Sequence, residues 1–336
     1  MNPYFKYPLI GLLVFIVLLV LVVRGCGGKE EAPEPGTPPS VTEVPPPAGP
    51  AVLPPPVAPP PSTPVQPSSV STPSSVQPSL VASPEAEKLL DSAREQLNRG
   101  MLEAARQIAR NVLRLPEVVE FDKTWRRAAE IIDTADKRLM NSTAPTSEKK
   151  KYVVVKNDNL TFIARRNFTS IGALKRINEN LRHNTVIRPS QTIMFIAGKW
   201  SIRVSKQHFL LMLYLNDELY RIYTVGIGRD NRTPAGTFLI TGLTEEPAWY
   251  RNDGQVIPYG DAENLLGTRW MKLTPTEGTD PTLEGYGIHG TWEPESCGTS
   301  CSAGCVRMRN EDVEELFDFI PPPGDRTPPV RVVIEE

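Results

Sequence analysis

Between residues 30 and 83 the chain holds eighteen prolines in fifty-four residues, and this stretch limits where a folded core can form. Proline lacks an amide N–H, and the stretch has no periodic apolar face that a core could bury. We therefore expect residues 30–83 to be a disordered proline-rich linker. In a polyproline II conformation, at about 3.1 Å per residue, it would extend on the order of 160 Å and act as a spacer.

The N-terminal segment, residues 1–29, contains sixteen consecutive apolar or neutral residues from Pro8 to Val23. Such a run is typical of a signal sequence or a short membrane anchor, although a full span takes about twenty residues. The residues Val23-Arg24-Gly25-Cys26 are similar to a bacterial lipobox, in which Cys26 would be acylated, but Arg at its second position is unusual. We therefore expect an uncleaved anchor, with a Cys26 lipoprotein as the alternative. Both predict a bacterial envelope protein whose remaining chain lies outside the cytoplasm, in the periplasm.

The length of 336 residues predicts two or three domains. With 37 basic and 39 acidic residues, the chain is close to neutral, which argues against bulk nucleic-acid binding.

Residues 84–141 read as a helical segment. Ser83, Pro84 and Glu85 supply an N-cap residue, a proline at the first helical position and an acid in the first turn. Three amphipathic faces follow, interrupted at Gly100 and Pro116. The pattern resembles one tetratricopeptide-type hairpin with a capping helix, which would dock a protein partner. A spacer or a self-association element is the alternative.

Residues 149–198 contain Tyr152-Val153-Val154, Asn157-Asp158-Asn159-Leu160 and Ile187-Arg188-Pro189-Ser190-Gln191. Read as a first strand, a turn into a helix and a closing segment, these runs resemble a LysM domain, a small βααβ module that binds peptidoglycan. Asn157 stands where the family usually has glycine, and Asn tolerates the left-handed conformation. Ten basic residues against two acidic ones favour an anionic polymer such as peptidoglycan, with an ordinary solvated basic surface as the alternative.

The C-terminal region contains His289-Gly290 and, sixteen residues after the histidine, Cys305 in the run Ser302-Ala303-Gly304-Cys305-Val306-Arg307. A thiol attacks a carbonyl carbon well when a base takes its proton and nearby donors stabilise the oxyanion. His289 and Cys305 can supply the base and the nucleophile. Gly304 permits a positive φ, so that successive amides can converge on one oxygen. A buried structural cysteine and histidine are the bland alternative.

These residues resemble the signature of the L,D-transpeptidases, the YkuD-like family, in which H-G is followed about fifteen residues later by S-x-G-C-[IV]-R. Two upstream runs strengthen the resemblance, Thr233-Pro234-Ala235-Gly236-Thr237-Phe238 and Gly267-Thr268-Arg269-Trp270. It covers residues 199–336 and implies a mainly-β catalytic domain. The chain departs from the family at Ala303, where a histidine is common.

The resemblance also implies the roles of single residues. Cys305 is the expected nucleophile, His289 the general base and acid, and the Gly290 carbonyl orients the imidazole. The loop amides at Ala303, Gly304 and Cys305 hold the oxyanion. The expected substrate-binding residues are Arg307, Ser302 and Trp270, and for Arg307 a structural ion pair is the alternative.

The family's reaction cross-links peptidoglycan stem peptides through a thioacyl intermediate. With water as the acceptor the enzyme would be an L,D-carboxypeptidase, and with a lysine of an envelope protein it would attach that protein to the wall. Ala303 keeps open a wall-binding scaffold without catalysis.

Within residues 199–336 the pattern predicts strands and one helix capped by Asn310. The strands are expected at Ile202–Ser205, Phe209–Leu215, Leu219–Val225, Thr237–Thr241, Trp270–Leu273, Gly287–Thr291 and Val330–Ile334. Cys297 and Cys301 precede Cys305 at intervals of four, but no second histidine or fourth thiol lies near, so we predict no metal and no cofactor. These two cysteines are then small core residues or a local disulfide.

Overall fold

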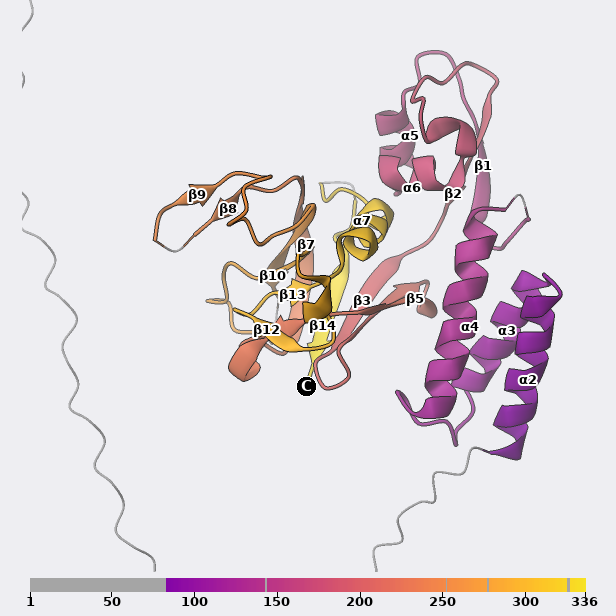
Figure 1. Ribbon diagram of the computed structural model, residues 1–336. Coiled ribbons are helices and arrows are strands. Elements are labelled where there is room, and N and C mark those ends of the chain that lie inside the picture. The colour runs from indigo at the N-terminus through magenta and orange to yellow at the C-terminus, as the bar shows by residue number, and fades with distance from the viewer. Residues whose placement is uncertain (1–82, 143, 252, 277, 325–326) are drawn as a thin grey trace, which may run out of the picture. The chain divides into compact units, whose positions relative to one another are not determined.

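A computed structural model describes residues 83–142, 144–251, 253–276, 278–324 and 327–336. Along the chain it contains three helices, a small α/β unit and a mainly-β domain (Figure 1). The expected anchor at Pro8–Val23 and the proline-rich linker lie outside the described residues. Among the helices of the described part, none is long and apolar enough to cross a membrane.

The predicted helical segment forms three helices. They are α2 (Pro84–Asn98), α3 (Leu102–Leu113) and α4 (Lys123–Met140). Pro84 occupies the first helical position of α2, and Gly100, with φ of 78°, separates α2 from α3. Asp122 caps α4 by accepting a hydrogen bond of 2.6 Å from the Trp125 amide. Each predicted apolar face therefore lies on a helix of its own.

The small α/β unit has the expected βααβ order. Its elements are β1 (Lys149–Val153), α5 (Leu160–Arg166), α6 (Ile171–Ile177), the 3₁₀ turn η1 (Glu179–Leu181) and β2 (Thr192–Ile196). Strands β1 and β2 pair antiparallel, and Leu160, Ile163, Leu174 and Ile193 are among the residues of its core. Asn157 has φ of 72°, as predicted for the turn before α5.

The C-terminal domain is built on an eight-stranded sheet in the order β13-β11-β10-β7-β14-β3-β4-β5. Its strands are β3 (Trp200–Ser205), β4 (Leu210–Leu215), β5 (Glu218–Thr224), β7 (Gly236–Glu245), β10 (Arg269–Pro275), β11 (Gly287–His289), β13 (Val306–Arg307) and β14 (Arg331–Glu335). The pairs β14–β3 and β11–β13 are parallel, and the other neighbours are antiparallel. All seven predicted strands are confirmed within a few residues at their ends.

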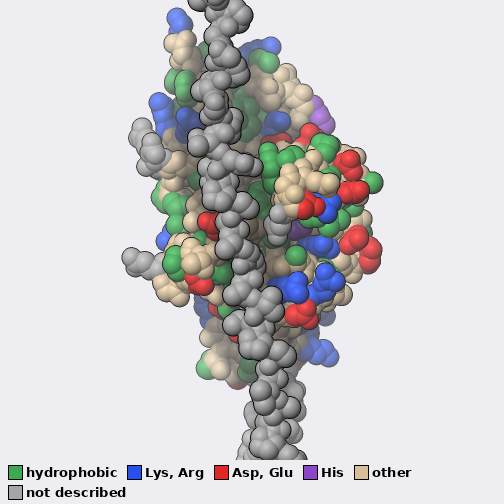
Figure 2. All heavy atoms as spheres, turned by 90° about the vertical axis from the view of Figure 1, so that its left-hand side faces the viewer, with side chains coloured by type: hydrophobic (Ala, Val, Ile, Leu, Met, Phe, Trp, Pro, Cys, Tyr) green, Lys and Arg blue, Asp and Glu red, His purple; other side chains and the backbone are tan. Residues whose placement is uncertain are grey.

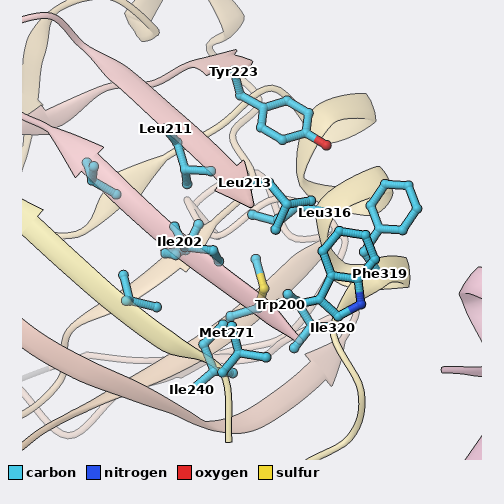
Figure 3. Close-up of a cluster of buried hydrophobic side chains, with 14 of the residues drawn as sticks. Trp200, Ile202, Leu211, Leu213, Tyr223, Ile240, Met271, Leu316, Phe319 and Ile320 are labelled. Carbon is cyan, nitrogen blue, oxygen red and sulfur yellow. The ribbon is translucent and has the colours of Figure 1, made fainter. Parts of the chain in front are cut away.

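The main core lies between one face of this sheet and helix α7 (Asn310–Phe319). Figure 3 shows Leu316 and Phe319 of α7 among side chains of the sheet such as Ile202 and Leu213. Trp200 packs on Phe319 with ring centroids 5.2 Å apart. One face of the sheet is therefore buried in the main core, and the opposite face of β7, β10 and β11 is not part of it.

The three helices cover part of the sheet beside this core. Their apolar residues form one cluster with Leu210 and Met212 of β4 and Leu219 of β5. At the same junction the buried Arg106 of α3 forms ion pairs with Asp136 of α4 and with Glu148, which precedes β1. The apolar faces of the three helices are therefore covered within the chain, and the docking of a partner, a spacer role and self-association stay predictions.

Several short elements were not predicted. They are β6 (Ile227–Gly228), β8 (Trp249–Tyr250), β9 (Val256–Ile257), β12 (Ser300–Ser302) and β13, and each has two or three residues. Such lengths cannot show an alternating pattern. The expected N-cap role of Asn310 is wrong. Asn310 is the first residue of α7, and its side-chain Oδ1 accepts a hydrogen bond of 3.1 Å from the Thr268 amide instead.

Candidate active site

A cleft of about 1370 Å³ lies on the sheet face opposite the main core. Strand β10, the β8–β9 hairpin and the segment before β11 supply most of its walls. Figure 2 views the molecule from the β8–β9 side of Figure 1 and shows acidic and basic side chains on the same face. The lining residues include Trp270, Lys272, Glu284, Tyr286, Gly304 and Cys305.

The pairing of β11 with β13 brings the two motif residues to this cleft. Ile288 pairs with Val306 in a parallel register, and both side chains are buried in the main core. Because side chains alternate along a strand, His289 and Cys305 lie on the opposite face, with Cys305 level with Gly287. Cys305 lines the cleft, and His289 is 3% exposed.

His289 is held by a backbone carbonyl and an aromatic ring. Its Nδ1 lies 2.6 Å from the carbonyl oxygen of Gly290, which favours the tautomer with the proton on Nδ1. The indole of Trp270 stacks against the imidazole with centroids 5.7 Å apart. The contact with Gly290 is the one expected from the sequence, and it leaves Nε2 as the basic nitrogen.

No hydrogen bond joins His289 to Cys305 in the described structure. The thiol instead donates to the carbonyl oxygen of Gly285 over 3.6 Å. The two residues are diagonal neighbours on adjacent strands, a relation that separates backbones by about 7–8 Å and still lets long side chains meet. The His289 imidazole and the Cys305 thiol therefore lie on the same sheet face with a short gap between them, and a bound substrate would lie at this gap.

Both groups are uncharged at neutral pH. Burial lowers the pKa of His289 to about 4, and the positive charge of Arg307 acts in the same direction, against hydrogen bonds to the backbone at Gly290 and Leu266. Burial raises the pKa of the Cys305 thiol to about 11, against a hydrogen bond from the Gly287 amide and the charge of Arg307. The resting pair is thus a neutral thiol beside a neutral imidazole.

The loop before Cys305 is fixed by two hydroxyl groups. Ser302 Oγ donates to the Cys305 carbonyl over 2.6 Å and accepts from the Gly304 amide over 3.1 Å. Thr233 Oγ1 donates to the Gly304 carbonyl over 2.8 Å. The Gly304 amide is therefore engaged with Ser302 in this structure, and the amides of Ala303 and Cys305 are the other candidate donors to the oxyanion.

Gly304 itself has φ of 147°, as the sequence suggested. A Cβ atom there would lie 2.8 Å from Cε1 of Tyr286, so the loop and the cleft wall fit together only with glycine at this position. From the sequence, Thr233 was identified only as the first residue of the T-P-x-G-x-F run, with no role of its own. Its role in holding the loop could have been suspected from that run, although its hydrogen-bond partner could not.

The three residues expected to bind substrate have different positions. Trp270 lines the cleft, whereas Ser302 and Arg307 are buried beside it and are absent from its lining. Arg307 forms an ion pair with Glu293 over 3.2 Å, which is the alternative to substrate binding that was considered for this residue. Ser302 acts on the loop backbone.

Cys297 and Cys301 are free thiols that lie next to Arg307. Cys297 Sγ is 3.9 Å from the Arg307 carbonyl oxygen, and Cys301 Sγ is 4.0 Å from Arg307 Nη1. Of the two expected states, the structure shows the partly buried thiols rather than a disulfide. Across the described ranges, no group of three or more Cys, His, Asp or Glu residues is arranged to hold a metal ion.

Comparison with known proteins agrees with this arrangement. Residues 199–334 match the YkuD family, the L,D-transpeptidase catalytic domain, and residues 152–194 match the LysM domain. A putative L,D-transpeptidase, YqjB of Bacillus subtilis, is 40% identical over 127 residues, which is 38% of this chain and 69% of that protein. The putative L,D-transpeptidase YkuD of the same organism is 30% identical over 175 residues, which is 51% of this chain and 93% of that protein.

Among solved structures, the catalytic domain of an E. faecium L,D-transpeptidase aligns with 41% of this chain and 98% of its own at 21% identity and a TM-score of 0.30. The family assignment depends on the two Bacillus relatives and the motif order. The chain therefore belongs to the YkuD family of L,D-transpeptidases, with a LysM domain preceding the catalytic domain.

Proposed function

We propose that this protein cross-links peptidoglycan stem peptides as an L,D-transpeptidase, with Cys305 as its nucleophile. The observation that carries the proposal is the β11–β13 register, which sets Cys305 and His289 on one sheet face at a cleft of about 1370 Å³. A cleft of this size accommodates a peptide.

In the first half-reaction the Cys305 sulfur bonds to the carbonyl carbon of the third stem residue while its proton moves to His289 Nε2. The amides of Ala303 and Cys305 are placed to stabilise the oxyanion. The carbon–nitrogen bond to the terminal D-alanine then breaks, and His289 returns the proton to that leaving amine. A thioester on Cys305 remains.

In the second half-reaction an amine from another stem attacks the thioester carbon and gives a proton to His289, the carbon–sulfur bond breaks, and that proton passes to the sulfur. The neutral state of both groups suits this sequence, because an imidazole with a pKa of about 4 stays unprotonated at neutral pH. The thiol, with a pKa of about 11, is deprotonated only as it attacks. The thiol therefore needs His289 to take its proton as the sulfur attacks.

The rest of the chain supports the same activity. The LysM domain binds the polymer and keeps the cleft near stem peptides, aided by ten basic residues within 149–198. Residues Pro8–Val23 hold the protein in the membrane with the catalytic domain in the periplasm, and acylated Cys26 is the alternative anchor. Replacing Cys26 with Ala separates the two, since only a lipoprotein would lose a lipid-dependent mass shift.

The test is acylation by a carbapenem followed by intact-mass analysis and peptide mapping. We expect one adduct, located on Cys305, absent from Cys305→Ala and retained when Cys297 and Cys301 are both Ala. Turnover with a tetrapeptide donor then assigns the acceptor, because a cross-linked dimer, a free tripeptide and a peptide-tagged envelope protein have different masses. An adduct on another cysteine, or no adduct and no product, would disprove the proposal.

A further inference from the structure

One row of residues runs across the open face of the sheet from the edge of the cleft to the nucleophile. Gly242 of β7 pairs with Lys272 of β10, and Lys272 pairs with Gly287 of β11. The register of β11 with β13 places Cys305 level with Gly287. Lys272 and Cys305 therefore lie in the same row, two strand spacings or about 10 Å apart, with the backbone of Gly287 between them.

The two glycines beside Lys272 leave room for neighbouring side chains. A Cβ atom on Gly242 would lie 3.3 Å from the Lys272 Cβ. A Cβ atom on Gly287 would lie 2.6 Å from the six-membered ring of Trp270. The Trp270 indole thus covers Gly287 and forms an aromatic floor between the lysine and the thiol.

Lys272 is also the cation of the cleft that is not neutralised. Two basic residues line the cleft, and the other one, Arg251, pairs with Asp253 at 2.9 Å and Glu263 at 3.4 Å. Lys272 is exposed, and no carboxylate of the described residues lies within ion-pair distance of it. A positive charge beside an aromatic floor favours a ligand that carries a carboxylate.

We propose that Lys272 binds the terminal carboxylate of the donor peptide's leaving residue, and so selects donors whose chain ends one residue after the bond that is cleaved. This proposal rests on the proposed function and names the residue that reads its donor. The distances agree. The attacked carbonyl lies about 3–3.5 Å from the sulfur, and one further residue adds about 3.8 Å. The carboxylate then lies about 7 Å from Cys305 over the indole, on the side of Lys272.

The test compares a tetrapeptide donor ending in a free carboxylate with the same peptide as its C-terminal amide. For the wild type, kcat/KM should be about tenfold higher with the acid, the lower end of the effect for a charged hydrogen bond, because Lys272 is exposed. In Lys272→Gln the acid should lose that advantage, and the amide should be turned over as by the wild type. Lys272→Arg should restore the preference, and Lys199→Gln, an exposed lysine outside the cleft, should retain it.

A binding measurement separates this proposal from the proposed function. In the Cys305→Ala background, the dissociation constant of the acid should be about tenfold below that of the amide, and Lys272→Gln should make the two equal. Absence of turnover with normal binding preference would refute the proposed function alone. Equal losses for acid and amide in Lys272→Gln, or no preference in the wild type, would overturn the role of Lys272. A preference that follows amidation of another carboxylate of the donor would overturn it too.

Iodoacetamide labelling of Cys305 checks the site itself, because this reagent is uncharged. Lys272→Gln should be labelled at the wild-type rate. Slower labelling would mean that the substitution disturbs the nucleophile, and a role in reading the carboxylate would then be refuted.

Discussion

The buried imidazole of His289 should make the free energy of unfolding fall at acidic pH. The substitution His289→Gln should remove this part of the pH dependence. Its pKa is about 4 in the folded protein and 6.5 in an unfolded chain. Between pH 4 and pH 6.5 the unfolded chain binds the proton more tightly than the folded protein does. The contribution of His289 to the free energy of unfolding is therefore fully present above pH 6.5 and is lost as the pH falls toward 4. His289→Gln abolishes this titration while keeping a polar side chain.

The size of the effect follows from the two pKa values. The difference between the two pKa values corresponds to about 3 kcal/mol at about 1.4 kcal/mol per pKa unit, and most of it is already lost at pH 4. Urea denaturation at pH 7.5 and pH 4.0 should therefore show the wild type losing about 3 kcal/mol more than His289→Gln. Other groups titrate in both proteins, so their contributions cancel in the comparison, as does the packing cost of the substitution.

The control is His183→Gln, at an exposed histidine of the α/β unit. Its pH dependence should match that of the wild type. Equal losses in the wild type and His289→Gln between pH 7.5 and 4.0 would refute the view that His289 is buried and neutral. The same outcome would remove the physical basis for a neutral base in the reaction.

Three further outcomes follow from the structure. Labelling of Cys305 by iodoacetamide should rise with a midpoint near pH 11, measured by mass spectrometry, and a midpoint near the ordinary thiol value of about 8.5 would contradict its burial. Gly304→Ala should slow carbapenem acylation of Cys305, measured as adduct formation over time, because the added Cβ forces the loop to move. Arg106→Met should destabilise the fold by about 3–5 kcal/mol in urea, because Asp136 and Glu148 lose a buried partner. A loss below about 1 kcal/mol there would mean that this cluster is solvated.

Sequence reasoning located the two central residues of the site because the motif spacing is specific. It could not place them on one sheet face, because β13 has only two residues and was not predicted. It could not show that the Gly304 amide is taken up by Ser302, since this depends on a side-chain rotamer within a three-residue turn. For the same reason it could not decide between the two roles considered for Arg307, whose partner Glu293 is fourteen residues away.

The alignment of Lys272 and Cys305 in one row could not be predicted from the sequence, for another reason. The residues of this row come from β7, β10, β11 and the position just before β13, so three strand pairings must have their correct registers before the four residues align. A shift of one residue in any pairing would turn Lys272 toward the opposite face relative to Cys305. Register is set by the pairing of strands far apart in sequence, so local pattern alone carries little information about it.

The packing of the helices on the sheet could have been predicted from the sequence of β4. The run from Leu210 to Leu215 is Leu-Leu-Met-Leu-Tyr-Leu, which does not alternate between apolar and polar residues. A strand reads this way when both of its faces are buried. Leu211 and Leu213 enter the main core, while Leu210 and Met212 pack with the helices on the other side. The apolar excess in β4 therefore indicates a cover for its second face, and the amphipathic helices of residues 84–140 provide it. The helical segment therefore packs against the catalytic domain through its apolar faces.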